Sequence, residues 1–320
     1  MSTSVLVLDK YADTYAGYLR ASFPDLVVHQ ALAMEHLSVD LAQIDILVAF
    51  GIAINNELIE RLASLKWIQS LATGVDHFLR CPALRPETLL TSARGIHGAA
   101  MRETVAYLML SLSQESRRLA RNQTEHRWDR SQPWSLLAGK TAVIVGVGLS
   151  SVAIAKLLAA LGMNVVGVSG APRLSEGFDC IVPRSELVEI AGEAVYLINV
   201  LPADPANIGL ISRSVIDAMK PSGFLVNVGR GETLDEDALI DALREQRIAG
   251  AGLDVFRNEP LPADSPIWDL PNVFLTPHLG GFFREYEEYM KPLLVENMRL
   301  FLGGRYGEMR NRISHGKEQS

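Results

Sequence analysis

The sequence predicts an α/β protein with two doubly wound parallel sheets, and three observations lead to this fold class. Short runs rich in Val, Ile and Leu alternate with helical patterns along almost the whole chain of 320 residues, which is typical of parallel sheets covered by helices. One run is followed by the turn Gly146-Val147-Gly148 and then directly by a helix. The hydrophobic content of 48% is sufficient to bury both sheets.

The first 100 residues predict the smaller domain, a doubly wound sheet of the flavodoxin-like type. Its strands are predicted at 4–8, 26–30, 44–50, 67–71 and 89–91, with helices at 11–22 and 56–65. Two loops follow strand ends, Thr73-Gly74-Val75-Asp76 and Arg94-Gly95-Ile96-His97. Because ligands of parallel sheets bind beyond the carboxyl ends of strands, both loops are candidate walls of a substrate site. The alternative for the first loop is a glycine turn in which Asp76 caps a helix.

The segment after residue 100 predicts a connection between the domains. A long apolar helix is expected at 103–115, and the polar, basic residues 116–137 are expected to form a surface arm. Trp128 and Trp134 lie in this arm, and large amphipathic rings often anchor subunit contacts. The arm could therefore bind a second copy of the chain, with ordinary packing on the adjoining domain as the alternative.

The larger domain is predicted over residues 101–286, and the smaller domain takes residues 1–100 together with 287–320. About six parallel strands are expected, at 141–145, 164–168, 194–200, 223–228, 249–255 and 273–276. Helices are expected at 184–191, 213–219 and 236–245. A helix at about 285–302 is expected to return to the smaller domain, and residues 314–320 to form a loose tail.

The glycine turn has the features of a dinucleotide-binding loop. Gly146 and Gly148 permit a tight turn, and the N-terminus of the following helix presents unpaired N–H groups to a pyrophosphate. Ser150 and Ser151 offer hydroxyl groups as N-caps. Ser151 stands at the third glycine position of the pattern, where a small side chain is expected to be tolerated. The larger domain is therefore predicted to be a Rossmann-type cofactor domain.

The end of the second strand of this unit indicates which dinucleotide binds. NAD-binding proteins usually carry an acidic residue there, which accepts a hydrogen bond from the ribose 2′-hydroxyl. This chain has Ser169 at that place and Arg173 shortly after it, and a hydroxyl with a guanidinium suits a 2′-phosphate. We predict NADP(H) in preference to NAD(H), which is the alternative cofactor. The alternative for Arg173 is a solvated loop cation.

The overall composition excludes several classes of protein. A formal net charge of −7 gives no general attraction to nucleic acid or to anionic lipid. No apolar run approaches the roughly 18 residues of a membrane span, and the N-terminus has no basic leader of the signal-peptide type. Cys81 and Cys180 are too few for a disulfide framework or a thiolate metal site. A cytoplasmic protein without a metal is expected.

Three polar side chains follow strands of the larger domain: Arg230, Glu259 and His278. Because the strand ends of a parallel sheet converge on one edge, these residues can meet despite their separation in sequence. An arginine fork can hold a carboxylate, a histidine can exchange a proton near neutral pH, and a neighbouring carboxylate would favour the charged imidazole. Each residue alone has a structural alternative, in a cap, a glycine loop or a Glu-Pro turn. Together they suit the chemistry of 2-oxo acids.

Four motifs carry a resemblance to a known family. They are LATGVDHF at 71–78, GVGLSS at 146–151, VNVGRGETLDEDALIDAL at 226–243 and GLDVFRNEPLPADSPIWDLPNVFLTPHLGG at 252–281. With these motifs the chain resembles the D-isomer-specific 2-hydroxyacid dehydrogenases from about residue 4 to residue 307. A basic residue often found in the family at the place of Leu149 is missing, which puts the strength of pyrophosphate binding in question.

The resemblance implies roles for particular residues. Arg230, Glu259 and His278 would be the catalytic residues, and Asp254 would contact the nicotinamide carboxamide. The substrate would be bound by Thr73, Gly74, Val75, Arg230 and His278. The cofactor would be bound by Gly146, Gly148, Leu149, Ser150, Ser151, Ser169, Arg173, Leu201, Pro202, Val228, Asp254 and Gly280.

The implied activity is reduction of a 2-oxo acid to a D-2-hydroxy acid by hydride transfer from NADPH. Glyoxylate and hydroxypyruvate are the expected kind of substrate, with a bulkier 2-oxo acid as an alternative, because the loops at 50–52, 94–97 and 282–286 would set the choice. Two other activities stay open. One is an NAD-dependent dehydrogenase that works oxidatively, and the other is a dinucleotide-sensing protein without catalysis. A homodimer is expected from the resemblance.

Overall fold

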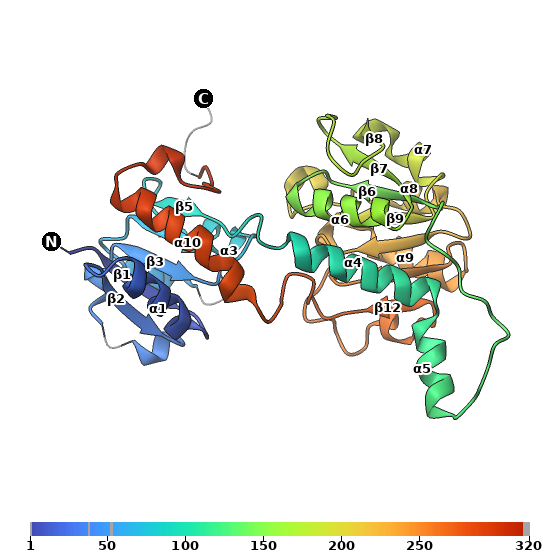
Figure 1. Cartoon of the computed structure of the whole chain (residues 1–320), viewed down its shortest axis with the longest axis horizontal. Helices are drawn as coiled ribbons and strands as arrows, with labels where there is room; N and C mark the ends of the chain where they lie inside the picture. The colour runs from blue at the N-terminus through green and yellow to red at the C-terminus, as the bar shows by residue number, and fades with distance from the viewer. Residues whose placement is uncertain (1, 38, 52–53, 316–320) are drawn as a thin grey trace. The chain divides into compact units, whose positions relative to one another are not determined.

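The computed structural model describes residues 2–37, 39–51 and 54–315, and its elements are shown in Figure 1. The chain divides into two compact units. The first unit contains the chain up to Ile96 and from Arg284 onward, and the second contains His97–Phe283. These boundaries lie a few residues from those predicted. The predicted tail falls largely on residues 316–320, which are outside the described residues, as is Ile52 of the predicted loop at 50–52.

The first unit contains a parallel sheet of five strands in the order β2-β1-β3-β4-β5. This is the flavodoxin-like order and confirms the predicted fold class. Its strands are β1 (Ser4–Leu8), β2 (Val27–Ala31), β3 (Ile46–Ala49), β4 (Trp67–Ser70) and β5 (Leu89–Thr91). Its helices are α1 (Ala12–Ser22), α2 (Asn56–Arg61), α3 (Asp76–Leu79) and α10 (Tyr286–Leu302). Helix α3 begins at Asp76, directly after the glycine turn.

The C-terminal helix α10 returns to this first unit, where it packs beside α1 (Figure 1). Trp67 of β4 is fully buried, and its ring stacks on Phe301 of α10 with 5.1 Å between the ring centroids. Asn297, also fully buried, adds a polar connection. Its amide nitrogen donates to Gln69 Oε1 at 2.9 Å and to the Arg310 carbonyl at 3.1 Å, and its amide oxygen accepts from the Arg310 N–H at 2.8 Å. Both contacts fix the helix against β4.

The second unit contains a parallel sheet of seven strands in the order β12-β11-β10-β9-β6-β7-β8. This is the Rossmann order with one additional strand, as predicted for the larger domain. The strands are β6 (Thr141–Val145), β7 (Asn164–Ser169), β8 (Cys180–Pro183), β9 (Tyr196–Asn199), β10 (Phe224–Asn227), β11 (Gly250–Leu253) and β12 (Val273–Leu275). The helices are α4 (Gly98–Ser113), α5 (Ser116–Thr124), α6 (Leu149–Ala160), α7 (Leu187–Ala191), α8 (Arg213–Ala218) and α9 (Glu236–Arg244).

Two elements of the second unit differ from the prediction. Strand β8 was missed, because it is an edge strand whose residues are exposed or only half-buried and which ends at Pro183. The predicted arm at 116–137 contains a helix, α5, and Arg117 of that helix donates to the carbonyls of Leu270 and Val273 at 2.7 and 2.9 Å. Most of the rest of the arm is exposed, including Trp128, whose exposed fraction is 90%, but Leu137 at its end is buried. Among the described residues, each helix is too short or too polar to cross a bilayer.

Replacing Asn297 by Ala should destabilise the first unit by about 2–4 kcal/mol, because it removes a fully buried amide that bonds to Gln69 Oε1 and to both backbone groups of Arg310. Urea unfolding followed by circular dichroism measures this loss. Glu296→Ala is the matched control, since Glu296 pairs with the same Arg310 through a largely exposed side chain and should cost at most about 1 kcal/mol. Equal losses in the two variants would contradict the role of the buried amide.

Candidate active site

The loops that follow the strands of the second unit gather at the carboxyl edge of its sheet. The strand order reverses between β6 and β9, the kind of place where open α/β sheets bind ligands. The loops after these two strands touch, since a Cβ on Gly146 would lie 3.1 Å from Leu201 Cδ2. Gly146 also has a φ of +99°, a left-handed conformation that favours glycine. The tight turn predicted for the glycine loop is therefore present.

The N-terminus of α6 is open to a ligand. Gly148 is its N-cap residue, so the prediction that Ser150 or Ser151 caps the helix was wrong. No side chain of the described residues caps this helix end, which leaves first-turn N–H groups for solvent or an anion. A Cβ on Gly148 would meet nothing within 4 Å, so the approach is unobstructed. These features fit the pyrophosphate of a dinucleotide.

Ser151, at the third glycine position, is accommodated inside the protein. The residue is 2% exposed, and its hydroxyl donates to the Gly146 carbonyl at 2.6 Å. The extra polar atom is therefore satisfied by the loop itself. Leu149, at the place where the resemblance implies a basic residue, is exposed and lines a hollow of about 400 Å³ together with Arg102 of α4. A cation from another helix thus lies near the start of α6.

Ser169 is the last residue of β7 and is half-buried. Its hydroxyl accepts from the Ala171 N–H at 3.2 Å, which holds the following turn. Arg173 is exposed and makes no ion pair within the described part of the chain. A second guanidinium, which the sequence did not reveal, lies against this turn: Arg184 Nε would be 3.5 Å from a Cβ on Gly170.

A buried polar network, not predicted from the sequence, holds the loops after β9 and β10. Asn199 donates to Asn227 Oδ1 at 3.0 Å and to Thr233 Oγ1 at 2.6 Å. Asn199 Oδ1 accepts from the Leu201 N–H at 3.2 Å, and the Thr233 hydroxyl donates to the Arg230 carbonyl at 2.6 Å. The only sequence signal was an Asn at the end of each apolar run. The network fixes the backbone that follows β9 and the backbone that follows β10.

His278 and Glu259 are in direct contact, as predicted. The distance from His278 Nδ1 to Glu259 Oε2 is 2.6 Å, and the side chains are 43% and 35% exposed. Because a carboxylate only accepts hydrogen bonds, Nδ1 carries the hydrogen and Nε2 is left for a substrate. Glu259 Oε1 accepts from the Phe256 N–H at 2.9 Å, so the carboxylate is itself oriented by backbone.

Arg230 is half-buried, and its guanidinium donates to the Gly229 carbonyl at 2.8 Å. No carboxylate of the described residues lies within ion-pair distance of it. The flanking glycines, Gly229 and Gly231, allow close packing inside the protein. A Cβ on Gly229 would lie 2.6 Å from the Leu201 carbonyl oxygen, and one on Gly231 would lie 2.0 Å from backbone atoms of Phe256.

Asp254 is 1% exposed and organises the loop that carries His278. Its Oδ1 accepts from Thr276 Oγ1 at 2.6 Å and from the Leu279 N–H at 2.8 Å, and its Oδ2 accepts from the Gly280 N–H at 2.9 Å. The His278 N–H donates to the Asp254 carbonyl at 2.8 Å. A carboxylate has about four acceptor positions, so one on Oδ2 remains for another donor such as a carboxamide.

His97, part of a loop predicted as a substrate wall, lies near Arg230. Burial and then the positive charge of Arg230 lower the pKa of His97 to about 4. Its ring also covers Gly281, where a Cβ would lie 3.2 Å from His97 Cδ2. The imidazole is therefore neutral at physiological pH, unlike a proton donor of the usual kind.

The other predicted substrate loop belongs to the first unit. Thr73, Gly74 and Val75 connect β4 to α3, and Val75 is buried in the core of that unit while Thr73 is exposed. The start of the loop is fixed by the Tyr286 hydroxyl, which donates to the Leu71 carbonyl. The backbone just before residues 73 and 74 is thus fixed by a hydrogen bond.

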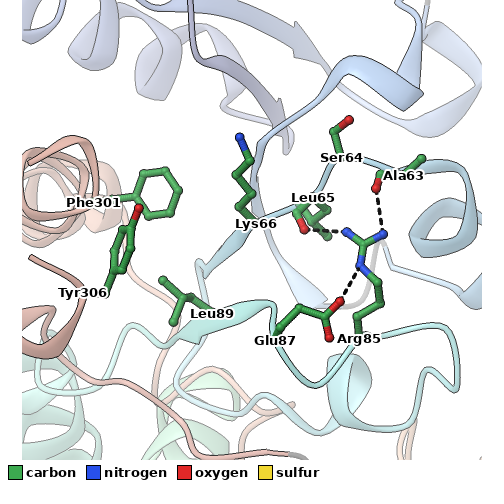
Figure 2. Close-up of a pocket in the computed structure, with 9 residues that line it drawn as sticks. All are labelled: Ala63, Ser64, Leu65, Lys66, Arg85, Glu87, Leu89, Phe301 and Tyr306. Carbon is green, nitrogen blue, oxygen red and sulfur yellow. Dashed lines mark hydrogen bonds and ion pairs between the residues drawn. The ribbon is translucent and has the colours of Figure 1, made fainter. Parts of the chain in front are cut away.

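A separate cavity of about 560 Å³ lies in the first unit, beside residues that precede β4 and β5 (Figure 2). Its two cations are already satisfied. Lys66 pairs with Asp45 at 2.7 Å, and Arg85 donates to the carbonyls of Ala63 and Leu65 at 2.7 and 2.6 Å. The cavity is at the amino edge of the strands, whereas parallel sheets bind ligands at the carboxyl edge. We do not assign it to the active site.

The second unit has the arrangement of a nicotinamide-dependent dehydrogenase: an uncapped glycine turn for a dinucleotide and, further along the same edge, a histidine–carboxylate pair with an arginine. Family models agree with this class. The model described as D-isomer specific 2-hydroxyacid dehydrogenase, NAD binding domain, matches residues 106–280, and the catalytic domain of the same family matches residues 5–78. The chain belongs to the D-isomer specific 2-hydroxyacid dehydrogenase family.

Individual relatives cover nearly the whole chain. Glyoxylate/hydroxypyruvate reductase B of Pectobacterium carotovorum subsp. carotovorum is 29% identical over 316 residues, or 96% of this chain and 97% of that protein. A solved family member from Aeromonas salmonicida subsp. salmonicida has a TM-score of 0.91 at 32% identity, covering 98% of this chain and 99% of that one. The NADPH-dependent glyoxylate/hydroxypyruvate reductase of Sinorhizobium meliloti, solved with NADP and sulfate, has a TM-score of 0.82 at 27% identity, covering 97% and 98%. This chain is an NAD(P)-dependent 2-hydroxyacid dehydrogenase.

The lowered pKa of His97 predicts a loss of stability in mild acid. In the unfolded chain a histidine has a pKa of about 6.5, so between pH 6.5 and pH 4 the unfolded state binds more protons and stability falls as the pH falls. His97→Gln cannot take up this proton. The free energy of unfolding of the wild type relative to this variant should therefore drop by about 2 kcal/mol from pH 7 to pH 5.

Urea unfolding at the two pH values measures this difference. Replacement of the exposed His126 by Gln is the matched control for the loss of an imidazole. A pH-independent difference between the wild type and His97→Gln would show that His97 is not held neutral in the folded protein.

Proposed function

We propose that the chain reduces a small 2-oxo acid to the D-2-hydroxy acid with NADPH. The observation that supports this most directly is the 2.6 Å contact between His278 Nδ1 and Glu259 Oε2, which leaves His278 Nε2 for a proton transfer. Arg230, without a carboxylate partner in the described structure, adds a cation on the same strand edge.

Each of the three residues has a separate task in this reaction. A bound reduced nicotinamide supplies the hydride. Protonated His278 donates a proton from Nε2 to the carbonyl oxygen of the substrate and so becomes neutral. Glu259 accepts from Nδ1 throughout and keeps the ring oriented. Arg230 binds the substrate carboxylate and stabilises the negative charge that develops on the carbonyl oxygen.

The cofactor would extend along the carboxyl edge of the sheet of the second unit. The N–H groups at the start of α6 (Leu149, Ser150 and Ser151) would bind the pyrophosphate. Ser169 and Arg173 would bind the adenosine end, Leu201 and Pro202 would cover the adenosine, and Val228, Asp254 and Gly280 would contact the nicotinamide end. The remaining acceptor position on Asp254 Oδ2 suits the N–H₂ of a carboxamide.

NADPH is proposed over NADH because the turn after β7 carries no carboxylate. Ser169, Gly170 and Arg173 occupy the place where an acidic residue would bind the 2′-hydroxyl and repel a 2′-phosphate. Two solved relatives give support of the same kind, since the Sinorhizobium meliloti enzyme was solved with NADP and a Xanthobacter autotrophicus family member, 27% identical with a TM-score of 0.84, was solved with NADPH.

Glyoxylate and hydroxypyruvate are the proposed substrates, because the relatives of similar length are named for them. Thr73, Gly74 and Val75 of the first unit stay proposed ligands of the substrate carboxylate. His97 is proposed as a neutral polar neighbour of the substrate, since it lies near Arg230. Its ring would discriminate among substrate side chains without adding a second acid.

A homodimer and a cytoplasmic location complete the proposal. The arm after α5 exposes Trp128, Trp134 and Leu136, with exposed fractions of 90%, 58% and 75%, and large exposed apolar side chains in one segment favour a protein partner. The two cysteines are free thiols, which suits a reducing compartment.

Oxidation of the nicotinamide, followed by absorbance, tests the proposed function directly. Glyoxylate, hydroxypyruvate and a bulky 2-oxo acid are each assayed with NADPH and with NADH. We expect turnover of a small 2-oxo acid with a kcat/KM at least about tenfold higher for NADPH, because one charge-assisted contact to the 2′-phosphate contributes about 1.5–3 kcal/mol. Binding of cofactor without turnover of any 2-oxo acid would contradict the proposal.

Replacing His278 by Gln should lower kcat by about 10²–10⁴-fold with little change in the dissociation constant for NADPH, because the proton donor is lost and the cofactor contacts are not. Glu259→Gln should lower kcat less, since the amide can still contact the ring but no longer supports its charged form. Stopped-flow turnover and cofactor fluorescence titration measure the two quantities. Normal turnover by His278→Gln would remove His278 from its role.

A further inference from the structure

We propose that Arg184 is a second cofactor-selecting arginine, which binds the 2′-phosphate of NADP(H) from the end of the strand next to the one that carries Ser169. This inference rests on the proposed use of NADPH and adds to it a residue outside the turn at 169–173. Arg184 directly follows β8 (Cys180–Pro183), and Ser169 is paired with Pro183 in the register of β7 and β8. The strand pairing therefore places Arg184 opposite Gly170.

The guanidinium lies against the backbone at which a 2′-phosphate would sit. A Cβ on Gly170 would be 3.5 Å from Arg184 Nε and 3.9 Å from both Cδ and Cζ. Gly170 is exposed and has no side chain to cover the arginine, while Arg184 itself is half-buried. Three groups that suit a phosphate thus border one turn: the Ser169 hydroxyl, the Arg173 guanidinium and the Arg184 guanidinium.

Arg184 is held in place by neutral partners. Its Nη2 donates to Asn207 Oδ1 at 2.7 Å and its Nη1 donates to the Ala206 carbonyl at 3.3 Å. A guanidinium has five N–H donors, so these contacts leave three for a ligand. Because both partners are uncharged, the side chain is oriented while its full positive charge stays available.

Three carboxylates of the neighbouring segments have other partners. Glu176 pairs with Lys156, Asp179 accepts from the Val165 N–H at 2.7 Å, and Asp204 accepts from the Ala206 N–H at 2.8 Å. Among the described residues, none forms an ion pair with Arg184 within 4 Å. An oriented, half-buried cation without a counter-ion beside a glycine turn points to an anionic ligand.

The alternatives to this role are distinguishable. Arg184 could brace the turn at 205–207 without touching a ligand, or its planar face could stack on the adenine ring. The adenine is common to both cofactors, whereas the 2′-phosphate belongs to NADP(H) alone. Loss of a phosphate contact would therefore weaken the binding of NADP(H) and leave that of NAD(H) unchanged. Loss of stacking or bracing would weaken the binding of both cofactors.

Isothermal titration calorimetry with 2′,5′-ADP and with 5′-AMP separates the two contributions, because these probes differ only in the 2′-phosphate and need no turnover. For Arg184→Gln we expect the dissociation constant for 2′,5′-ADP to rise tenfold or more, and that for 5′-AMP to change less than twofold. Arg184→Lys should recover part of the loss, and the wild-type preference for 2′,5′-ADP should weaken with added salt.

Arg213→Gln is the matched control, since Arg213 is an exposed arginine of the same unit that pairs with Asp241 at 2.9 Å. It should leave both dissociation constants unchanged, and thermal melting of each variant checks the fold. An unchanged preference in Arg184→Gln, or an equal loss for both probes, would overturn the role of Arg184 and leave the proposed function intact. A wild-type protein that binds 2′,5′-ADP no more tightly than 5′-AMP would instead overturn the NADPH preference, and the role of Arg184 with it.

Discussion

The buried carboxylate of Asp254 is the interaction on which the catalytic edge of the second unit depends. A buried charge without hydrogen bonds would cost several kcal/mol, so the segment after β12 wraps around it and supplies donors from Thr276, Leu279 and Gly280. This wrapping holds His278 at a φ of +53°, a conformation that non-glycine residues rarely adopt. It also explains Gly280, where a Cβ would lie 2.7 Å from Asp254 Oδ2. The histidine is thus oriented before any substrate arrives, which is the basis of electrostatic preorganisation.

Neutral hydrogen bonds, rather than ion pairs, hold Arg230 and Arg184. Arg230 is bonded to the Gly229 carbonyl, and Arg184 to an amide and a carbonyl oxygen. By contrast, Arg213 and Arg257 pair with Asp241 and Asp237. A carboxylate partner would cancel the charge that a ligand needs, whereas a carbonyl orients the side chain and leaves its charge available. Buried amides such as that of Asn199 do the same for the backbone, because they connect loops from different strands without a net charge.

The sequence predicted the elements that are buried on both faces and missed features that depend on pairing. The bounds of β1, β5 and β6 are those expected, because each is a short apolar run followed by a polar or glycine residue. Strand β8 has no such pattern, being half-exposed, and without it the register that places Arg184 beside Gly170 cannot be inferred. The helix cap was assigned to a serine from propensity, but the chain uses Gly148 and turns the Ser151 hydroxyl inward. Contacts between residues far apart in sequence, such as that of His97 with the charge of Arg230, have no local signal at all.

The order of the strands also separates cofactor choice from chemistry. In the proposed complex, residues after β7 and β8 would border the adenosine end, whereas His278 follows β12 at the opposite side of the seven-stranded sheet. Five strand spacings of about 4.8 Å place β7 roughly 24 Å from β12. Solvent-exposed charges interact weakly beyond a Debye length of about 8 Å at physiological salt. A charge change near Ser169 therefore has little direct effect on the proton transfer at His278. In the proposed complex the extended cofactor would connect the two regions, and its 2′-phosphate would determine which dinucleotide binds without altering the groups that act on the substrate.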